Sequence, residues 1–293
     1  MIRSRRQTLK KMGGLTVTKY ARSLLATAFL SNAILLSAML TSSVRADEHD
    51  GGPGPIFNVV HFDVIPATVN GVDFLQNAYA LLFKYRDQST GDEGLESFRV
   101  LNLVPPTTNH SEIVQVWKSY EDYKDHLAQP QTIAFRFDVQ GNPALGGECC
   151  IGSPIDDRQY SLVKSFNTPW SAKSIPSTVG PSGALYIITY VELLQEGNVA
   201  LGQAELVAYG AETARVNRSH VLSYNVLQQL DRPNRHAVLE IWDSPASYAA
   251  WQGLAATTGF VAKITPLLGS PFDHRLTILC GETYSDSAGC IAP

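Results

Sequence analysis

Short apolar runs rich in branched residues alternate along the chain with longer amphipathic stretches. Residues 56–64 form the first such run, which predicts a β-strand that Pro66 ends. From Val72 to Tyr85, apolar side chains recur at three- and four-residue spacing, which predicts a helix with one buried face. The same reasoning predicts the remaining elements of this half: strands near 98–104 and 113–117, a helix after Ser119, and a strand near 160–166.

The second half of the chain repeats this order of elements. Three segments match their counterparts at offsets of 126, 125 and 117 residues: Ser97–Leu101 with Ser223–Leu227, Val116–Ser119 with Ile241–Ser244, and Gly152–Arg158 with Gly269–Arg275. Ordered matches of this kind are typical of an internal duplication, and the change of offset indicates an insertion in the first copy near 141–147. The equivalent predicted elements are strands 185–194, 221–228, 236–242 and 275–280, and helices near 200–214 and from Pro245 onward.

Each copy reads β-α-β-β-α-β, the order of a ferredoxin-like α+β module. Its two helices can cover only one face of a four-stranded sheet. The other face is left apolar and bare, and an exposed apolar face of that size needs a partner. We therefore expect the two sheets of one chain to pack face to face as an intrachain pseudo-dimeric α/β barrel, and the protein to be a monomer.

The N-terminal residues predict an export signal. Residues 4–10 are basic and similar to a twin-arginine signal, residues 24–40 are apolar, and Val44-Arg45-Ala46 offers the small residues that a signal peptidase reads. The ordinary secretory route stays open, as does a retained anchor, although the apolar stretch is short for a span. We expect an exported protein, periplasmic or extracellular. Its predicted organisation is a signal peptide 1–46, an acidic, glycine-rich segment 47–55, a first module 56–167, a linker 168–183, a second module 184–282 and a tail 283–293.

The predicted signal peptide is basic, whereas the rest of the chain is acidic. Eight of the 23 Lys and Arg residues and none of the 27 Asp and Glu residues lie in 1–46, which leaves 15 basic against 27 acidic residues, a net charge of −12. Such a surface repels phosphate backbones and anionic headgroups, so we expect no nucleic-acid partner and no membrane partner after signal removal. Because the sequence also lacks a nucleotide loop, a catalytic-serine elbow and a zinc motif, the expected partner is a small apolar or aromatic molecule.

Four cysteines follow the predicted cleavage site: Cys149, Cys150, Cys280 and Cys290. An even number of cysteines in an exported chain favours disulfides, and four cysteines allow three pairings. A bond between the neighbours Cys149 and Cys150 would close a tight, strained ring. Each of the two is therefore expected to stay free or to reach Cys280 or Cys290, and the connectivity stays open.

At this point the residues resemble the antibiotic-biosynthesis-monooxygenase domains of the dimeric α/β-barrel superfamily, over most of 56–166 and 184–281. The resemblance rests on the valine-rich first strand, on Ser-aromatic-x-Val-Leu in the second strand, on the Trp that ends the third strand, and on His126 in the helix behind it. The family's usual acidic residue two before that Trp is Glu240 in the second copy but Gln115 in the first. The helical His126 is matched by Trp251 in the second copy. Because the copies differ, we expect one working pocket, in the first module.

The resemblance implies a monooxygenase that oxidises a small aromatic or quinol-type substrate without a cofactor. Such a site needs a dry cavity, a base and groups that stabilise negative charge. We expect Trp117 to stack on the substrate, His126 to act as base or donor, Asn58 to bind a substrate oxygen, and Tyr123 to share the helix face of His126. The alternatives are a core position for Trp117 and a solvated or capping role for His126.

Two other functions stay open, and with them the question of whether the protein is an enzyme. Asn58, Trp117 and His126 are similar in placement to the residues of haem-degrading members of the superfamily, and haem would be a cofactor under that interpretation only. A duplicated barrel could also bind a small ligand or a protein without catalysis.

Three further residues receive structural predictions. His61 alternates with Val60 and Phe62 along the first strand, so we expect it to face the other sheet. Arg158 and Arg275 follow the repeated Gly-Ser-Pro, and their repetition in both halves favours a structural salt bridge or a loop anchor over catalysis.

Overall fold

The computed structural model describes residues 54–65, 68–69, 72–104, 109–140, 150–172, 183–195 and 197–280, all within one unit that spans Asp50–Pro293. The predicted signal peptide, most of the segment 47–55, nearly all of the linker after Ala172, and the tail therefore lie outside the described residues. Among the described residues, no helix combines the length and the apolar character that crossing a bilayer requires.

The first half of the chain contains the predicted strands, one more helix than expected, and two further short strands that pair with each other outside the barrel. Its elements are β1 (Ile56–Asp63), β2 (Thr68–Val69), β3 (Val72–Asp73), α2 (Phe74–Ser89), β4 (Leu95–Leu103), β5 (His110–Trp117), α3 (Tyr120–Leu127), α4 (Pro130–Gln140) and β6 (Asp156–Asn167). The single helix expected after Ser119 is two helices, because Pro130 cannot continue α3 but suits the first turn of α4.

The second half repeats this arrangement. Its elements are β7 (Leu185–Glu192), α5 (Asn198–Val216), β8 (Val221–Gln229), β9 (Arg235–Trp242), α6 (Pro245–Gln252), α7 (Ala255–Ile264), the 3₁₀ turn η2 (Thr265–Leu267) and β10 (Asp273–Leu279). Ser119 and Ser244 cap equivalent helices: each side chain accepts a hydrogen bond from the backbone N–H three residues later. The repeated Trp-x-Ser thus ends a strand and begins a helix in both halves.

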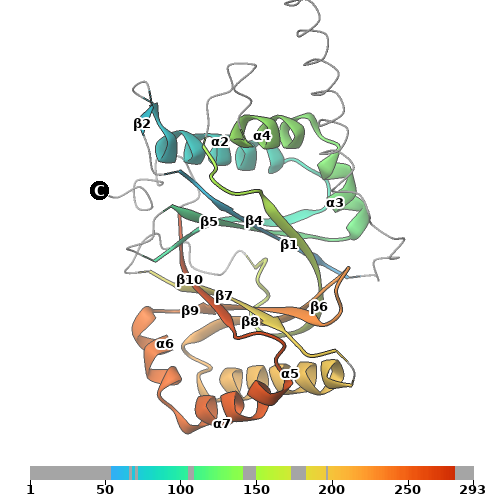
Figure 1. Ribbon diagram of the computed structural model, residues 1–293, viewed down its shortest axis with the longest axis vertical. Coiled ribbons are helices and arrows are strands. Elements are labelled where there is room, and N and C mark those ends of the chain that lie inside the picture. The colour runs from blue at the N-terminus through green and yellow to red at the C-terminus, as the bar shows by residue number, and fades with distance from the viewer. Residues whose placement is uncertain are drawn as a thin grey trace, which may run out of the picture. The chain divides into compact units, whose positions relative to one another are not determined.

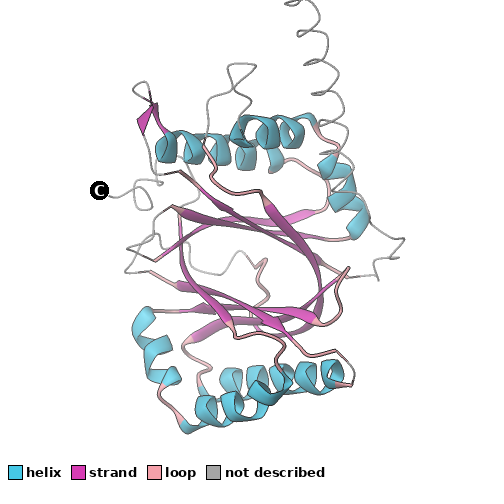
Figure 2. Cartoon of the chain, viewed as in Figure 1, coloured by secondary structure: helices cyan, strands magenta, loops and turns pink. Residues whose placement is uncertain are grey.

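The eight long strands form a closed antiparallel barrel in the order β1-β5-β4-β10-β7-β9-β8-β6. The last strand of each half joins the two halves, since β6 pairs with both β1 and β8, and β10 pairs with both β7 and β4. Helices α2, α3 and α4 cover one side of the barrel and α5, α6 and α7 the opposite side, with the strands between them (Figures 1 and 2). The predicted α+β barrel within a single chain is confirmed.

Alternating side chains along the strands separate three apolar layers. On β1, Phe57 and Val59 belong to the cluster inside the barrel, whereas Val60 and Phe62 pack under α2 and α4. A third cluster lies between the second sheet and α5 to α7. Trp170, within the predicted linker 168–183, is buried inside the barrel and packs edge-on against Tyr186, 5.6 Å between ring centroids, so the start of that segment is part of the core.

Cys150 and Cys280 are both fully buried in the cluster under α2, and neither is a free thiol. Cys149 and Cys290 lie outside the described residues, so the pairing of the four stays a prediction.

We expect reduction to destabilise the protein by about 2–5 kcal/mol, the usual cost of losing a disulfide in a small exported domain. Thermal melting with and without reductant, together with thiol titration under denaturing conditions, measures this. Identical midpoints and four titratable thiols would show that the cysteines are not bridged.

Candidate functional site

Two hollows lie in equivalent places, each between the sheet of one half and the helices that cover it. The first hollow holds about 310 Å³ of empty space, its open mouth included, and Asn58, Tyr85, Gln115 and His126 supply polar atoms to its wall. The second hollow holds about 420 Å³ on the same measure, and Tyr209, Tyr224, Glu240 and His274 line it.

The first hollow brings together two of the four residues that the sequence nominated. Asn58 and His126 line it, and Asn58 donates from Nδ2 to Gln115 Oε1 at 3.0 Å. Trp117 is fully buried and packs against the His126 ring, with 4.5 Å between centroids. Tyr123 is also buried, and its hydroxyl donates to the Asp157 carboxylate at 3.3 Å. Trp117 and Tyr123 therefore support the wall from behind and do not line the hollow.

His126 lies in a chain of short hydrogen bonds. Its Nδ1 is 2.6 Å from Asp92 Oδ2, and its Nε2 is 2.6 Å from the Tyr85 hydroxyl. A carboxylate offers only acceptors, so we assign the proton to Nδ1, and Nε2 then accepts from Tyr85. Burial lowers the pKa of His126, with Asp92 partly opposing this shift, and burial raises the pKa of Tyr85 to about 12. Near pH 7 the ring is neutral, and both of its nitrogens already have partners.

This arrangement does not fit haem. An axial histidine needs an imidazole nitrogen that faces open space, and here Asp92 and Tyr85 occupy both nitrogens of His126. Asn58 is likewise held on both sides, since Gln159 Nε2 donates to its Oδ1 at 3.3 Å and its Nδ2 donates to Gln115. Trp117, the third member of the set, does not reach the hollow.

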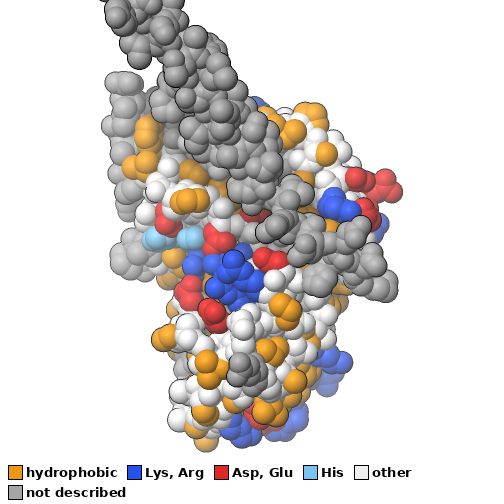
Figure 3. Space-filling view, turned by 45° about the vertical axis from the view of Figure 1, so that its right-hand side comes forward, with side chains coloured by type: hydrophobic (Ala, Val, Ile, Leu, Met, Phe, Trp, Pro, Cys, Tyr) orange, Lys and Arg blue, Asp and Glu red, His pale blue; other side chains and the backbone are white. Residues whose placement is uncertain are grey.

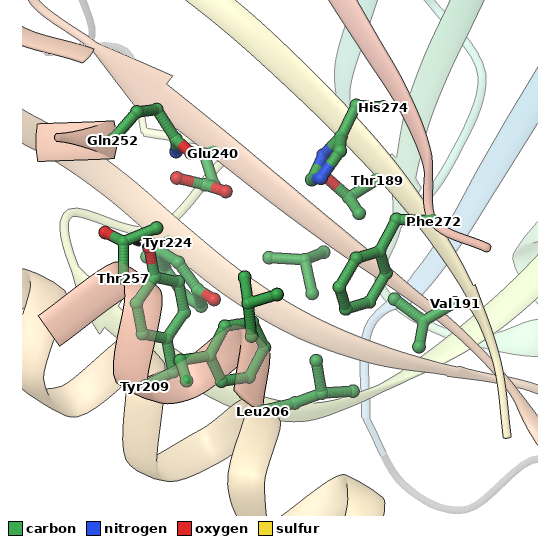
Figure 4. A pocket seen from close by; sticks show the side chains of 13 residues that line it. Thr189, Val191, Leu206, Tyr209, Tyr224, Glu240, Gln252, Thr257, Phe272 and His274 are labelled. Atoms are coloured by element: carbon green, nitrogen blue, oxygen red, sulfur yellow. Dashed lines mark hydrogen bonds between the residues drawn. The ribbon is translucent and has the colours of Figure 1, made fainter. Parts of the chain in front are cut away.

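The second hollow contains a carboxyl group with few partners. Glu240 is 7% exposed, and Trp242 Nε1 donates to its Oε2 at 2.9 Å. Among the described residues, no hydrogen bond engages Oε1. Figure 4 shows the carboxyl pointing into the space between Gln252, His274 and Tyr209.

Burial raises the pKa of Glu240 to about 7, and the hydrogen bond from Trp242 offsets only part of this rise. The group therefore exchanges a proton near neutral pH, which is what a general base requires. Across the hollow, His274 Nδ1 lies 2.8 Å from Thr189 Oγ1, and burial lowers the pKa of this imidazole. Glu240 is thus the acidic group of this hollow, opposite a neutral histidine.

The hollows are built from equivalent residues, which the repeat relates. Tyr85 corresponds to Tyr209, Gln115 to Glu240, His126 to Trp251, Thr132 to Thr257, and Phe135 to Phe260. Phe135 stacks on Tyr85 at 4.3 Å and Phe260 on Tyr209 at 4.0 Å, and Trp251 Nε1 donates to Tyr209 as His126 accepts from Tyr85. Two polar changes in the lining are that Glu240 of the second hollow replaces the amide of Gln115, and that the apolar Val261 replaces the guanidinium of Arg136. The imidazole of His126 lines the first hollow, whereas the indole of Trp251 does not line the second.

Sequence reasoning missed several of these residues. Asp92 lies in a turn before β4, 34 residues before His126, and no local pattern links the two. Tyr209 and Thr257 could have been found by extending the repeat through the helices, because they are equivalent to Tyr85 and Thr132, which lie near His126. His274 already lay in the matched segment Gly269–Arg275. Glu240 was identified from the resemblance but was assigned to the mainly structural copy.

The fold is a closed α/β barrel built from two copies of one module within a single chain, and solved structures share this fold. A candidate monooxygenase from Fusobacterium nucleatum has a TM-score of 0.59 at 12% identity, covering 78% of this chain and 93% of that chain. An anthrone oxidase-like protein has a TM-score of 0.53 at 15% identity, with 78% and 92% covered. A candidate monooxygenase from Lactobacillus acidophilus has a TM-score of 0.52 at 11% identity, with 78% and 97% covered.

At these identities the likeness establishes the fold and leaves the chemistry to the residues. The resemblance to monooxygenase-like α/β barrels that the sequence predicted is therefore confirmed at the level of the fold. No family model matches the sequence, and no curated protein matches it.

Proposed function

We propose that the protein is a monooxygenase for a small hydroxylated aromatic substrate of the quinol or anthrone type, and that the reaction takes place in the second hollow. The observation that carries this proposal is Glu240, a buried carboxyl with a pKa of about 7 that points into an aromatic-lined cavity. The sequence alone favoured the first module and His126. We now prefer Glu240, because both nitrogens of His126 already have partners.

Glu240 would act as the general base. Ionised, it takes a proton from the hydroxyl or the activated carbon of the substrate, and Oε1 is the atom available for this step. The substrate anion is electron-rich and passes electrons to oxygen. For a methylene that becomes a carbonyl, the substrate supplies all four electrons that reduce O₂, one oxygen atom enters the product and the other leaves as water. No external reductant is needed for this balance.

The walls of the second hollow suit such a substrate. Tyr209 and Phe260 stack at 4.0 Å, and Phe272 lies 6.1 Å from Phe260 between centroids, so aromatic faces and edges surround the space. Burial raises the pKa of Tyr209 to about 12, so its hydroxyl stays protonated at neutral pH. That hydroxyl already contacts Thr257 at 3.1 Å and Trp251 at 2.8 Å, which fixes its position beside the substrate.

An oxygen-electrode assay on a panel of quinols, polyphenols and anthrones, with chelator and without added flavin, tests the proposal. We expect the rate of oxygen uptake by the wild type to rise as the pH increases through about 7, because the ionised carboxylate of Glu240 is the active form. Glu240→Gln should lower kcat by roughly 10²–10⁴-fold, the usual contribution of a general base.

Two variants make the test specific. Glu93→Gln makes the same substitution at an exposed carboxyl and should leave uptake unchanged. His126→Ala should retain most of the activity if the second hollow is the reaction chamber. Loss of activity in His126→Ala together with full activity in Glu240→Gln would assign the reaction to the first hollow. Absence of uptake with every substrate, combined with saturable quenching of tryptophan fluorescence, would indicate a ligand-binding protein.

A further inference from the structure

A second group of polar side chains lies on the other face of β1, the face that looks into the barrel. His61 and Asp63 alternate with the residues under α2, so they point the same way as Phe57 and Val59. In the antiparallel register, Asp63 lies directly opposite His110 and His61 directly opposite Glu112. Two strands thus place four polar side chains at adjacent positions.

Three of these side chains converge on one point. His61 Nε2 is 3.3 Å from Asp63 Oδ1, and His110 Nδ1 contacts the same carboxylate oxygen. The three ligand atoms all lie within 4.8 Å of one another, and the two imidazole rings are nearly parallel, 14° apart with centroids separated by 6.0 Å. All three side chains are partly exposed, so an ion from solvent can reach them.

We propose that His61, Asp63 and His110 bind a divalent transition-metal ion such as Zn²⁺. Two imidazole nitrogens and one carboxylate oxygen are the ligands of many zinc sites that keep a fourth position open. With zinc–ligand bonds of about 2.0–2.2 Å, two ligands of a tetrahedral zinc lie about 3.4 Å apart. The 3.3 Å between His61 Nε2 and Asp63 Oδ1 matches that separation.

Residues behind the ligands complete the arrangement. His61 Nδ1 is buried and lies 3.1 Å from Glu112 Oε1, a close contact that is not aligned as a hydrogen bond. Metal-bound histidines usually pass their second ring N–H to a carboxylate, which fixes the tautomer and the ring. Glu112 is itself held by Arg275 Nη1 at 2.6 Å and by the Tyr190 hydroxyl at 3.3 Å. A metal on Nε2 of His61 would select the tautomer that donates from Nδ1 to Glu112.

The charges around the site favour a cation. With neutral imidazoles, the carboxylates of Asp63, Glu112, Asp156 and Asp273 outnumber the guanidinium groups of Arg158 and Arg275. The surface view shows histidine side chains beside clustered acidic and basic side chains (Figure 3). Opposite charge attracts the ion, and the two arginines hold the nearby carboxylates in place.

The site is independent of the proposed reaction chamber. Asn58 and Val60 line the first hollow from the opposite face of β1, and Glu240 lies in the second hollow. The three ligands of the proposed metal site come from the first module, whereas Arg275 and Tyr190, which contact Glu112, come from the second. A bound ion would therefore brace the junction of the two modules.

Titration calorimetry of the untagged mature chain with Zn²⁺, and absorption spectra with Co²⁺, test the site. We expect one ion per chain in the wild type and no saturable binding at this stoichiometry in His61→Ala or His110→Ala. Glu112→Gln should still bind one ion, with an affinity lower by about 10–100-fold, the usual effect of losing a carboxylate behind a ligating histidine. Circular dichroism of each metal-free variant checks that it is folded.

His220→Ala is the matched control, because His220 also pairs with an aspartate, Nδ1 to Asp243 Oδ2 at 2.8 Å. Among the residues that the structure describes, His220 is not part of a group with a second histidine that could hold an ion. The metal affinity of this variant should equal that of the wild type. The proposal is overturned if the wild type binds no ion, or if folded His61→Ala and His110→Ala bind as tightly as the wild type.

Discussion

Glu240→Gln is expected to stabilise the protein at pH 8 while it removes the base. Burial raises the pKa of Glu240 from 4.5 to about 7 in the folded state, so folding favours the protonated carboxyl. The contribution of this group to stability is therefore complete below pH 4.5 and is lost as the pH rises through about 7. A shift of this size corresponds to about 3 kcal/mol, because one pKa unit is about 1.4 kcal/mol.

Urea unfolding at pH 4.5 and at pH 8 measures this effect. At the lower pH, the free energy of unfolding of Glu240→Gln should nearly equal that of the wild type. At the higher pH, it should be larger than the wild-type value by up to about 3 kcal/mol. A glutamine can keep the indole hydrogen bond, since Gln115 Oε1 lies 3.4 Å from Trp117 Nε1 in the first half. Glu93→Gln, at an exposed position, should show no such pH dependence. A constant difference at both pH values would contradict the raised pKa.

Arg275→Met is expected to destabilise the barrel by about 3–5 kcal/mol, because it leaves a buried carboxylate without its cation. Arg275 Nη1 lies 2.6 Å from Glu112 Oε1, and the Glu112 side chain has no exposed surface. This ion pair connects β10 of the second half to β5 of the first. Thermal and urea unfolding in the presence of chelator measure the loss, and adding Glu112→Gln should recover most of it.

Arg158→Met provides the matched control from the other copy. Arg158 lies 4.7 Å from the Tyr190 ring and Arg275 lies 4.8 Å from it, so each substitution removes a similar contact with this ring. Arg158, however, pairs with Asp156, a partly exposed carboxylate, and such pairs contribute at most about 1 kcal/mol. Equal losses in the two variants would show that the buried charge of Glu112 is not the cause. The salt-bridge roles predicted for both arginines agree with the contacts observed.

The order of elements could be predicted from the sequence because it depends on local spacing. Strands and helices leave periodic patterns over short stretches, such as the branched apolar run 185–194 and the helical spacing from Val72 to Tyr85. Because the module is repeated, each element could be predicted from two copies of its pattern. The break between α3 and α4 was missed, although Pro130 marks it. The orientation of His61 toward the other sheet was predicted from alternation along β1. It agrees with the contact of His61 with Glu112, because Glu112 in turn contacts Tyr190 and Arg275 of the second half.

The candidate sites could be predicted only in part. Residue types and the resemblance pointed to Asn58 and His126, and both line a hollow. Nothing in the sequence indicated that Asp92 and Tyr85 would occupy both nitrogens of His126. The pairing of His61 and Asp63 with His110 also depends on strand register, which a sequence without an alignment does not specify.

The sequence by itself determined the duplicated α+β module and the need for the two sheets to cover each other, because apolar periodicity fixes which face of each element must be buried. Only the tertiary structure decided where the titratable groups lie. A carboxyl such as Glu240 has an ordinary pKa in any unfolded chain, and its value of about 7 arises from the desolvation that neighbouring elements impose. Because nearly all of those neighbours come from residues 12 to 51 positions away, the chemistry of the barrel depends on packing that no local pattern encodes.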